Sequence, residues 1–321
     1  MKEINILDIN NIKIGHAQSF EGGTGCTVII APNSAYAGVD IRGGGPASRE
    51  TPLLNPISGT DKIHAILLSG GSAFGLDAAG GVMDFLEKKN IGFDVGVTKV
   101  PLVCQSCIFD LAIGDKKARP AKEMAYKACE NAWNNEKPRQ GCIGAGTGAT
   151  VGKLLGTEQC MKSGVGMYAV DINGLKVGAI AVVNALGDIF NSKGKKIAGL
   201  LNKDHTDFLS SEQIMYESIE PKNTLFITNT TICCVITNAN FNKAEINKIA
   251  AMAQNGVARS INPVHTTADG DTVYALCTGE IQADLNTVGT LSARVLSTAI
   301  ENGVKNATGM YGLKAITDLT F

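Results

Sequence analysis

Two short polar stretches of the 321-residue sequence hold residue types that could do chemistry. Thr230 follows Asn229 at the start of an apolar, β-branched run, so a hydroxyl stands at the head of a predicted buried strand. Asp269 and Asp271 flank Gly270 between a predicted helix and a predicted strand. Close like charges raise the pKa of one carboxyl, which suits proton transfer. From spacing alone, ordinary turns and strands are the favoured interpretation of both stretches, because Asn and Asp favour turns and Thr favours strands.

The remaining histidines and glycine-rich loops form no recognisable metal, nucleotide or serine-hydrolase motif. The histidines are scattered, with none at metal-ligand spacing from another: His16, His64, His205 and His265. Gly144–Gly148 has the wrong third spacing for a dinucleotide-binding fingerprint, and the sequence holds neither a P-loop nor a G-x-S-x-G elbow. We therefore expect no cofactor and no metal. Two further glycine-rich loops, Arg42–Pro46 and Ser69–Ser72, are either tight turns or parts of a substrate site.

The cysteines and the net charge indicate a cellular compartment and argue against some classes of partner. Nine cysteines, with Cys233 and Cys234 adjacent, predict buried free thiols, and the single pair Cys104 and Cys107 is weak evidence for zinc. A net charge of −1 without a long Lys/Arg run gives no electrostatic case for nucleic acid or an anionic membrane as partner. No apolar stretch follows Lys2, so no signal peptide is predicted and we expect a cytoplasmic protein.

The elements that must position these residues are predicted from hydrophobic periodicity. Strands are expected at Cys26–Ala31, Ala65–Leu68, Val165–Ile172, Leu175–Asn184, Leu225–Thr228, Thr230–Thr237 and Thr272–Leu276. Helices are expected at Ser72–Lys89, Ala121–Trp133, Lys243–Ser260 and Leu285–Lys305. Asn173-Gly174 predicts a type I′ hairpin turn. A hairpin beside separate helices favours an α/β (α+β) fold, with sheets packed between helix layers, over a parallel doubly wound sheet.

Local signals refine these elements. Ser72 and Asn242 are candidate N-caps, and Glu245 would complete a capping box with Asn242. Gly80 and Gly81 fall within a predicted helix, so the helix packs closely there or bends. The polar, lysine-rich segment Asn191–Ile214 is predicted to be a surface excursion or linker. We expect a single domain over residues 1–321.

Several motifs follow one another along nearly the whole chain. They are Asp40–Pro46 with Arg49–Thr51, Leu68–Leu76, Gly144–Gly148, Val182–Asp188, Asn229–Thr231 and Asp269–Asp271. Each motif is modest alone, but in this order they resemble the L-aminopeptidase/D-esterase family, which includes β-peptidyl aminopeptidases and the nylon-oligomer hydrolase. The resemblance implies a four-layer αββα sandwich of the N-terminal-nucleophile-hydrolase type.

The resemblance also implies a precursor that cuts its own backbone between Asn229 and Thr230. The products would be an α chain of residues 1–229 and a β chain of residues 230–321. Thr230 would then carry both a hydroxyl nucleophile and a free α-amino group that serves as its base. A precursor whose amine is still in a peptide bond is expected to be inactive on external amides.

Further residues take their expected roles from the family. Asp269 and Asp271 match its polar pair behind the nucleophile, and this Asp-x-Asp form with an Asn-Thr cut resembles the nylon-oligomer hydrolase more closely. Asn184 matches the asparagine that stabilises the oxyanion, although a turn residue is the ordinary alternative. Lys153 matches a lysine that lowers the pKa of the Thr230 amine, although most lysines lie on the surface. The resemblance implies a small peptide or amide substrate and a homo-oligomer, a tetramer of processed αβ units.

One departure and two alternatives remain. The tyrosine that assists catalysis in some aminopeptidases has no counterpart after Val100–Gln105, where Phe109 is nearby instead. An acyltransferase of the ornithine-acetyltransferase type also cleaves itself before a threonine, but its characteristic residues are not seen around the cut. A relative that keeps the fold and never matures would leave the Asn229–Thr230 bond intact.

Overall fold

The computed structural model describes residues 1–218 and 229–319. Its α-helices are α1 (Ala79–Lys88), α2 (Lys122–Trp133), α3 (Ser211–Glu217), α4 (Lys243–Ser260) and α5 (Leu285–Lys305). Its strands are β1 (Lys2–Glu3), β2 (Lys13–Ser19), β3 (Thr24–Ile41), β4 (Ala47–Arg49), β5 (Lys62–Ser69), β6 (Phe93–Asp94), β7 (Lys99–Val100), β8 (Val103–Cys107), β9 (Thr150–Val151), β10 (Met161–Lys162), β11 (Val165–Ile172), β12 (Leu175–Val182), β13 (Asp188–Phe190), β14 (Lys196–Ala198), β15 (Ile232–Ala239), β16 (Ile261–Asn262) and β17 (Thr272–Ile281). The predicted strand Leu225–Thr228 lies outside the described residues.

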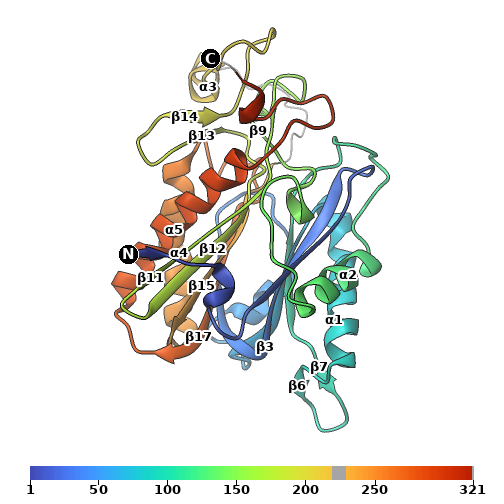
Figure 1. Ribbon diagram of the computed structural model, residues 1–321, viewed down its shortest axis with the longest axis vertical. Helices are drawn as coiled ribbons and strands as arrows, with labels where there is room; N and C mark the ends of the chain where they lie inside the picture. Colours follow the sequence, from blue (N-terminus) through green and yellow to red (C-terminus); the bar gives the residue numbers. More distant parts are fainter. Residues whose placement is uncertain (219–228, 320–321) are drawn as a thin grey trace.

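The main sheet has ten strands and runs β1-β11-β12-β15-β17-β3-β5-β8-β4, with β2 also paired to β3. The long strand β3 joins the two halves of this sheet, β1-β11-β12-β15-β17 and β5-β8-β4. Its first part pairs with β2 and β5, and its last part pairs with β17. The pairing of β3 with β5 shifts between Ile30 and Ala35, where Ser34 has a left-handed φ of 57°. Helices α4 and α5 lie on one side of the strands and α1 and α2 on the other (Figure 1).

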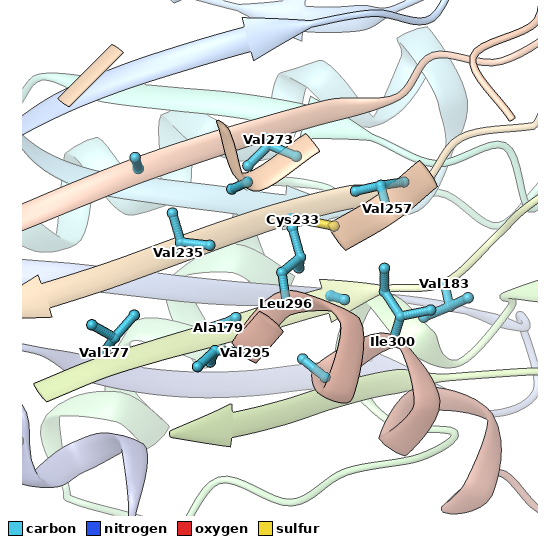
Figure 2. Close-up of a cluster of buried hydrophobic side chains, with 14 of the residues drawn as sticks. Val177, Ala179, Val183, Cys233, Val235, Val257, Val273, Val295, Leu296 and Ile300 are labelled. Atoms are coloured by element: carbon cyan, nitrogen blue, oxygen red, sulfur yellow. The ribbon is translucent and has the colours of Figure 1, made fainter. Parts of the chain in front are cut away.

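Three hydrophobic cores separate the four layers. On β15, Cys233 and Val235 belong to the core beneath α4 and α5, whereas Ile232, Cys234 and Ile236 point the opposite way into a central core. Figure 2 shows Cys233 of β15 close to Leu296 of α5, and Val235 and Ile300 belong to the same core. The central core also receives side chains from β5, so the two halves of the sheet face each other across it. Strands covered on both faces read as continuous apolar runs, as they do here.

The predicted αββα sandwich is confirmed. The predicted hairpin turn, helix cap and close helix packing are also present in the structure. The hairpin of β11 and β12 turns at Asn173 and Gly174, with φ values of 53° and 92°, both in the left-handed region that a type I′ turn requires. Helix α4 starts at the predicted capping box of Asn242 and Glu245. The backbone carbonyl of Lys122 lies 1.9 Å from where a Cβ on Gly81 would stand, so the glycine permits close packing of α1 on α2.

Other predicted boundaries were wrong. The segment predicted to be one helix from Ser72 begins as a 3-10 helix, Ser72–Ala78, and becomes α1 only at Ala79. Ser72 does not cap it, because its own backbone is left-handed, with a φ of 52°. Strand β15 begins at Ile232 rather than Thr230, because Thr230 is held by separate contacts described below.

The segment predicted to be a linker, Asn191–Ile214, contains β14 and the first residues of α3 and packs beyond one end of the main layers (Figure 1). The buried carboxylate of Asp188 holds it in place. That carboxylate accepts bonds from the Lys196 ammonium at 2.6 Å, the Leu200 N–H at 2.9 Å and the Ser211 N–H at 3.0 Å. The segment is therefore anchored rather than a free excursion.

All nine cysteines are buried and free, which confirms the prediction of reduced thiols. Within residues 1–218 and 229–319, none of the helices has both the length and the apolar character needed to cross a lipid bilayer.

Candidate active site

Sheet topology brings the two polar stretches together. Strands β15 and β17 are parallel neighbours in which Ile232 lies opposite Thr272, so the residues just before each strand meet at one edge. Thr230 lies just before β15, and the Asp269–Asp271 stretch lies just before β17. Strand β12 runs antiparallel to β15 and ends at Val182, opposite Ile232, which delivers Asn184 to the same edge.

Backbone bonds on both sides hold the peptide bond between Asn229 and Thr230 in place. Asn229 donates its N–H to the Ala268 carbonyl at 2.9 Å, and Thr230 donates its N–H to the Asn184 carbonyl at 2.9 Å. The carbonyl oxygen of Asn229 accepts the Gly270 N–H at 2.8 Å and also the hydroxyl of Thr230. Asn229 is 0% and Thr230 4% exposed, so the hydroxyl lies against the preceding carbonyl in a buried setting.

The two carboxylates have different surroundings. Asp271 is held at both oxygens: Oδ1 accepts the Thr231 N–H at 2.8 Å, and Oδ2 lies 2.9 Å from Nδ1 of His265 and accepts the His265 N–H at 3.2 Å. These bonds fix Asp271 as a support beneath the Thr230–Thr231 backbone. The sequence did not single out His265 as a site residue. Only its position six residues before Asp271 could have indicated the contact.

Asp269 is held on one side only. Its Oδ2 accepts the hydroxyl of Thr266 at 2.6 Å and the N–H of Thr266 at 2.8 Å. Burial, and then the charge of Asp271, raise the pKa of Asp269 to about 6, while Lys153 acts in the opposite direction. A carboxyl with a pKa near 6 can take up or release a proton near neutral pH, which is the property needed in general acid–base chemistry.

Lys153 is a buried lysine rather than a surface one. Its ammonium donates to the side-chain oxygen of Asn184 at 2.7 Å and to the backbone carbonyl of Asn184 at 3.1 Å. Burial lowers the pKa of Lys153 to about 7, although the nearby Asp269 and Asp110 raise it in part. The Asn184 carbonyl also accepts the Thr230 N–H at 2.9 Å, so Lys153 and the Thr230 nitrogen share one acceptor.

The side-chain amide of Asn184 is already engaged in the uncleaved chain. Its oxygen accepts the Lys153 ammonium and the Thr150 N–H, the latter at 3.1 Å, and its nitrogen donates to the Phe109 carbonyl at 3.1 Å. Since a primary amide has two N–H donors, one is left for any other acceptor. Phe109, which stands near the expected tyrosine position, thus contacts the site through its backbone.

The glycine-rich loop Arg42–Pro46 supports the carboxylates from behind. Gly45 donates its N–H to the Asp269 carbonyl at 2.8 Å, and Gly43 donates to the Asp271 carbonyl at 3.3 Å. A Cβ on Gly43 would lie 2.3 Å from the Asp271 nitrogen, so this close approach requires glycine. The sequence left this loop as either a tight turn or a part of a substrate site. Its direct contacts are those of a tight turn packed against backbone.

The loop Ser69–Ser72 contacts another buried carboxylate, that of Asp110. Gly71 donates its N–H to this carboxylate at 2.7 Å, and Thr24 donates its hydroxyl at 2.6 Å. A hollow of about 930 Å³ lies elsewhere, lined by residues that include Arg259 and Arg294, and it contains none of the residues around Thr230. Asn229 and Thr230 are buried and lie apart from this hollow.

The fold is similar to that of N-terminal-nucleophile hydrolases. The L-aminopeptidase D-Ala-esterase/amidase of Ochrobactrum anthropi, a variant of that fold, superposes with a TM-score of 0.70 at 16% identity, over 94% of this chain and 86% of that one. Residues 5–317 match the model of Peptidase family S58, and the chain belongs to that family. The family resemblance predicted from the motifs is thus confirmed, and the chain is a hydrolase of amide bonds.

Two relatives show the range of activities named among similar proteins. The chain is 39% identical over 295 residues to an uncharacterized aminopeptidase of Mycobacterium leprae, covering 87% of this chain and 79% of that protein. It is 31% identical over 285 residues to a 6-aminohexanoate-oligomer endohydrolase of Paenarthrobacter ureafaciens, covering 87% and 76% of the two chains.

Proposed function

We propose that this chain is a self-processing amide hydrolase that cleaves the Asn229–Thr230 bond and then uses Thr230 as an N-terminal nucleophile. The observation that carries the proposal is the buried contact between the Thr230 hydroxyl and the carbonyl of Asn229. A parallel bridge pairs the Asn229 backbone with Asp269, whose carboxyl has a pKa of about 6. Family membership supplies the amide-hydrolase chemistry, and the contact supplies the residue that would perform it.

Self-cleavage would proceed by transfer of the Asn229 acyl group from nitrogen to oxygen. The Thr230 oxygen bonds to the Asn229 carbonyl carbon and gives its proton to Asp269, and the carbonyl electron pair moves onto oxygen. The carbon–nitrogen bond then breaks, and the proton passes from Asp269 to the Thr230 nitrogen, leaving an ester. Water hydrolyses this ester to the Asn229 carboxylate and a free Thr230 hydroxyl and amine.

The mature site would repeat this chemistry on external amides, with the new amine of Thr230 as base. Lys153 lies within 3.1 Å of the carbonyl that holds the Thr230 nitrogen. Because burial lowers the pKa of Lys153 to about 7, its positive charge is present near and below neutral pH, where it would lower the pKa of that amine by like-charge repulsion. A lower pKa keeps more of the amine unprotonated, which is the form that accepts the hydroxyl proton.

Mass spectrometry of the purified protein tests the proposal. We expect fragments 1–229 and 230–321, with Thr230 at the N-terminus of the smaller one, and a Thr230→Ala chain that stays intact and lacks amidase activity. Thr231→Ala is the matched control, because the buried Thr231 hydroxyl has no partner among the described residues and should be dispensable for cleavage. Cleavage of the Thr230→Ala chain, or full activity from an intact wild-type chain, would refute the mechanism.

The substrate class follows from comparing kcat/KM across amino-acid p-nitroanilides, β-peptides and 6-aminohexanoate oligomers. The relatives named as aminopeptidase and as oligomer endohydrolase make both short peptides and oligoamides candidates. We propose a small amide substrate, because Thr230 is deeply buried and leaves little room for a folded protein.

A further inference from the structure

The surroundings of the Asn229 carbonyl oxygen have a consequence for catalysis. This oxygen gains a negative charge when the Thr230 oxygen attacks the carbonyl carbon, and buried N–H groups aimed at such an atom stabilise the charge strongly. The Gly270 N–H already donates to it at 2.8 Å. We propose that the backbone N–H of Gly270 is the oxyanion donor for self-cleavage and, in the mature enzyme, for hydrolysis of external amides. This inference rests on the function proposed above.

The alternative donor, the side-chain amide of Asn184, makes other contacts in the uncleaved chain. Its nitrogen donates to the Phe109 carbonyl, and its oxygen is held by Lys153 and Thr150. Gly270 is thus the donor that already contacts the reacting oxygen, and Asn184 holds Lys153 and the Thr230 backbone in place.

The peptide unit that carries this N–H is fixed before the reaction begins. The Asp269 carbonyl, on the opposite edge of the same peptide plane, accepts the Gly45 N–H at 2.8 Å. Hydrogen bonds on both edges of this peptide plane fix the direction of the Gly270 N–H, so it needs no reorganisation as negative charge develops on the oxygen. Such preorganisation is the condition for large electrostatic stabilisation. A Cβ on Gly270 would lie 2.8 Å from the Thr230 hydroxyl oxygen, so glycine also leaves room for the nucleophile.

The same N–H would remain in place after self-cleavage. It belongs to the segment before β17, whereas the oxygen it contacts belongs to Asn229, the last residue of the α chain. When the Asn229 carboxylate moves away, a buried donor is left facing the Thr230 hydroxyl. A substrate carbonyl placed for attack by Thr230 would bind to this donor in the position that Asn229 occupied.

Replacement of the amide at position 270 by an ester tests the proposal, because glycolic acid in place of Gly270 removes the N–H and adds no side chain. We expect self-cleavage, followed on gels after refolding, to slow by about 10²- to 10³-fold. An ester also makes the preceding carbonyl a weaker acceptor, here that of Asp269. An ester at Thr272 is the matched control, because it removes the neighbouring bond to the Thr231 carbonyl at 3.1 Å and weakens the Asp271 carbonyl in the same way, and it should leave the rate near that of the wild type. A cleavage rate within threefold of wild type for the position-270 ester would overturn the proposal.

The outcomes separate this inference from the proposed function. An intact wild-type chain would refute the function, whereas a cleaved wild type, an intact Thr230→Ala chain and a fast position-270 ester would refute only the role of Gly270. If the ester chain does not fold, a crystal structure of the mature enzyme with butylboronic acid on Thr230 decides instead. We expect a boronate oxygen at about 3 Å from the Gly270 nitrogen, and boronate oxygens bonded to other donors only would overturn the proposal.

Discussion

Protonation of Asp269 is expected to control the rate of self-cleavage. Its ionised carboxylate can accept the Thr230 hydroxyl proton, and its protonated form cannot. Because burial and the charge of Asp271 raise the pKa of Asp269 to about 6, about nine-tenths of the chains are ionised at pH 7 and about one-tenth at pH 5. The cleavage rate should therefore fall about tenfold for each pH unit below 6 and level off above 7.

The assay follows conversion of the precursor to its two fragments after rapid refolding into buffers from pH 4.5 to 8. Asp269→Asn keeps the size of the side chain and removes its basicity. We expect this variant to cleave about 10²- to 10⁴-fold more slowly at pH 7 and to lose the dependence on pH near 6.

His265 provides the control for a neighbouring side chain, because its Nδ1 lies 2.9 Å from the Asp271 carboxylate. His265→Asn is a suitable variant, since His265 has a left-handed φ of 58° and asparagine tolerates that conformation. It should retain the rate decrease below pH 6. A decrease that persists in Asp269→Asn and disappears in His265→Asn would refute the assignment of the base to Asp269.

Three further changes test the packing around the site. Gly270→Ala places a Cβ 2.8 Å from the Thr230 hydroxyl oxygen and 2.9 Å from the Gly45 carbonyl, so self-cleavage on gels should slow by about 10- to 100-fold while the chain still folds. Lys153 has a pKa lowered to about 7 by burial, so the folded chain holds it neutral between pH 7 and 10.5 while the unfolded chain binds a proton. The free energy of unfolding should rise with pH in that window by up to about 1.4 kcal/mol per unit, and Lys153→Met in urea titrations should flatten the rise. Asp188→Ala removes the buried carboxylate that anchors β14 and α3, so it should lower the free energy of unfolding by about 3 kcal/mol and expose that segment to limited proteolysis.

Patterns close together in the chain were enough to predict the helices α1, α2, α4 and α5 and the main-sheet strands β3, β5, β11, β12, β15 and β17, whereas the shorter strands were not predicted. The capping box at Asn242 and the turn at Asn173-Gly174 depend on neighbouring residues, and both were predicted correctly. The cap at Ser72 was predicted wrongly, because the left-handed backbone there is set by packing of the glycine-rich loop around Asp110, which is distant in sequence. The segment Asn191–Ile214 was taken for a linker because the role of the Asp188 anchor appears only when its partners are brought together.

The sequence by itself determined the family, the layer architecture and the candidate residues, because hydrophobic periodicity and motif order are properties of the chain. Tertiary structure alone decided how those residues differ. Asp269 and Asp271 read alike in the sequence, yet one is fixed by Thr231 and His265 and the other has a pKa of about 6. Burial, and contacts between strands far apart in the chain, set hydrogen bonding and pKa, so no local pattern could have separated the two carboxylates.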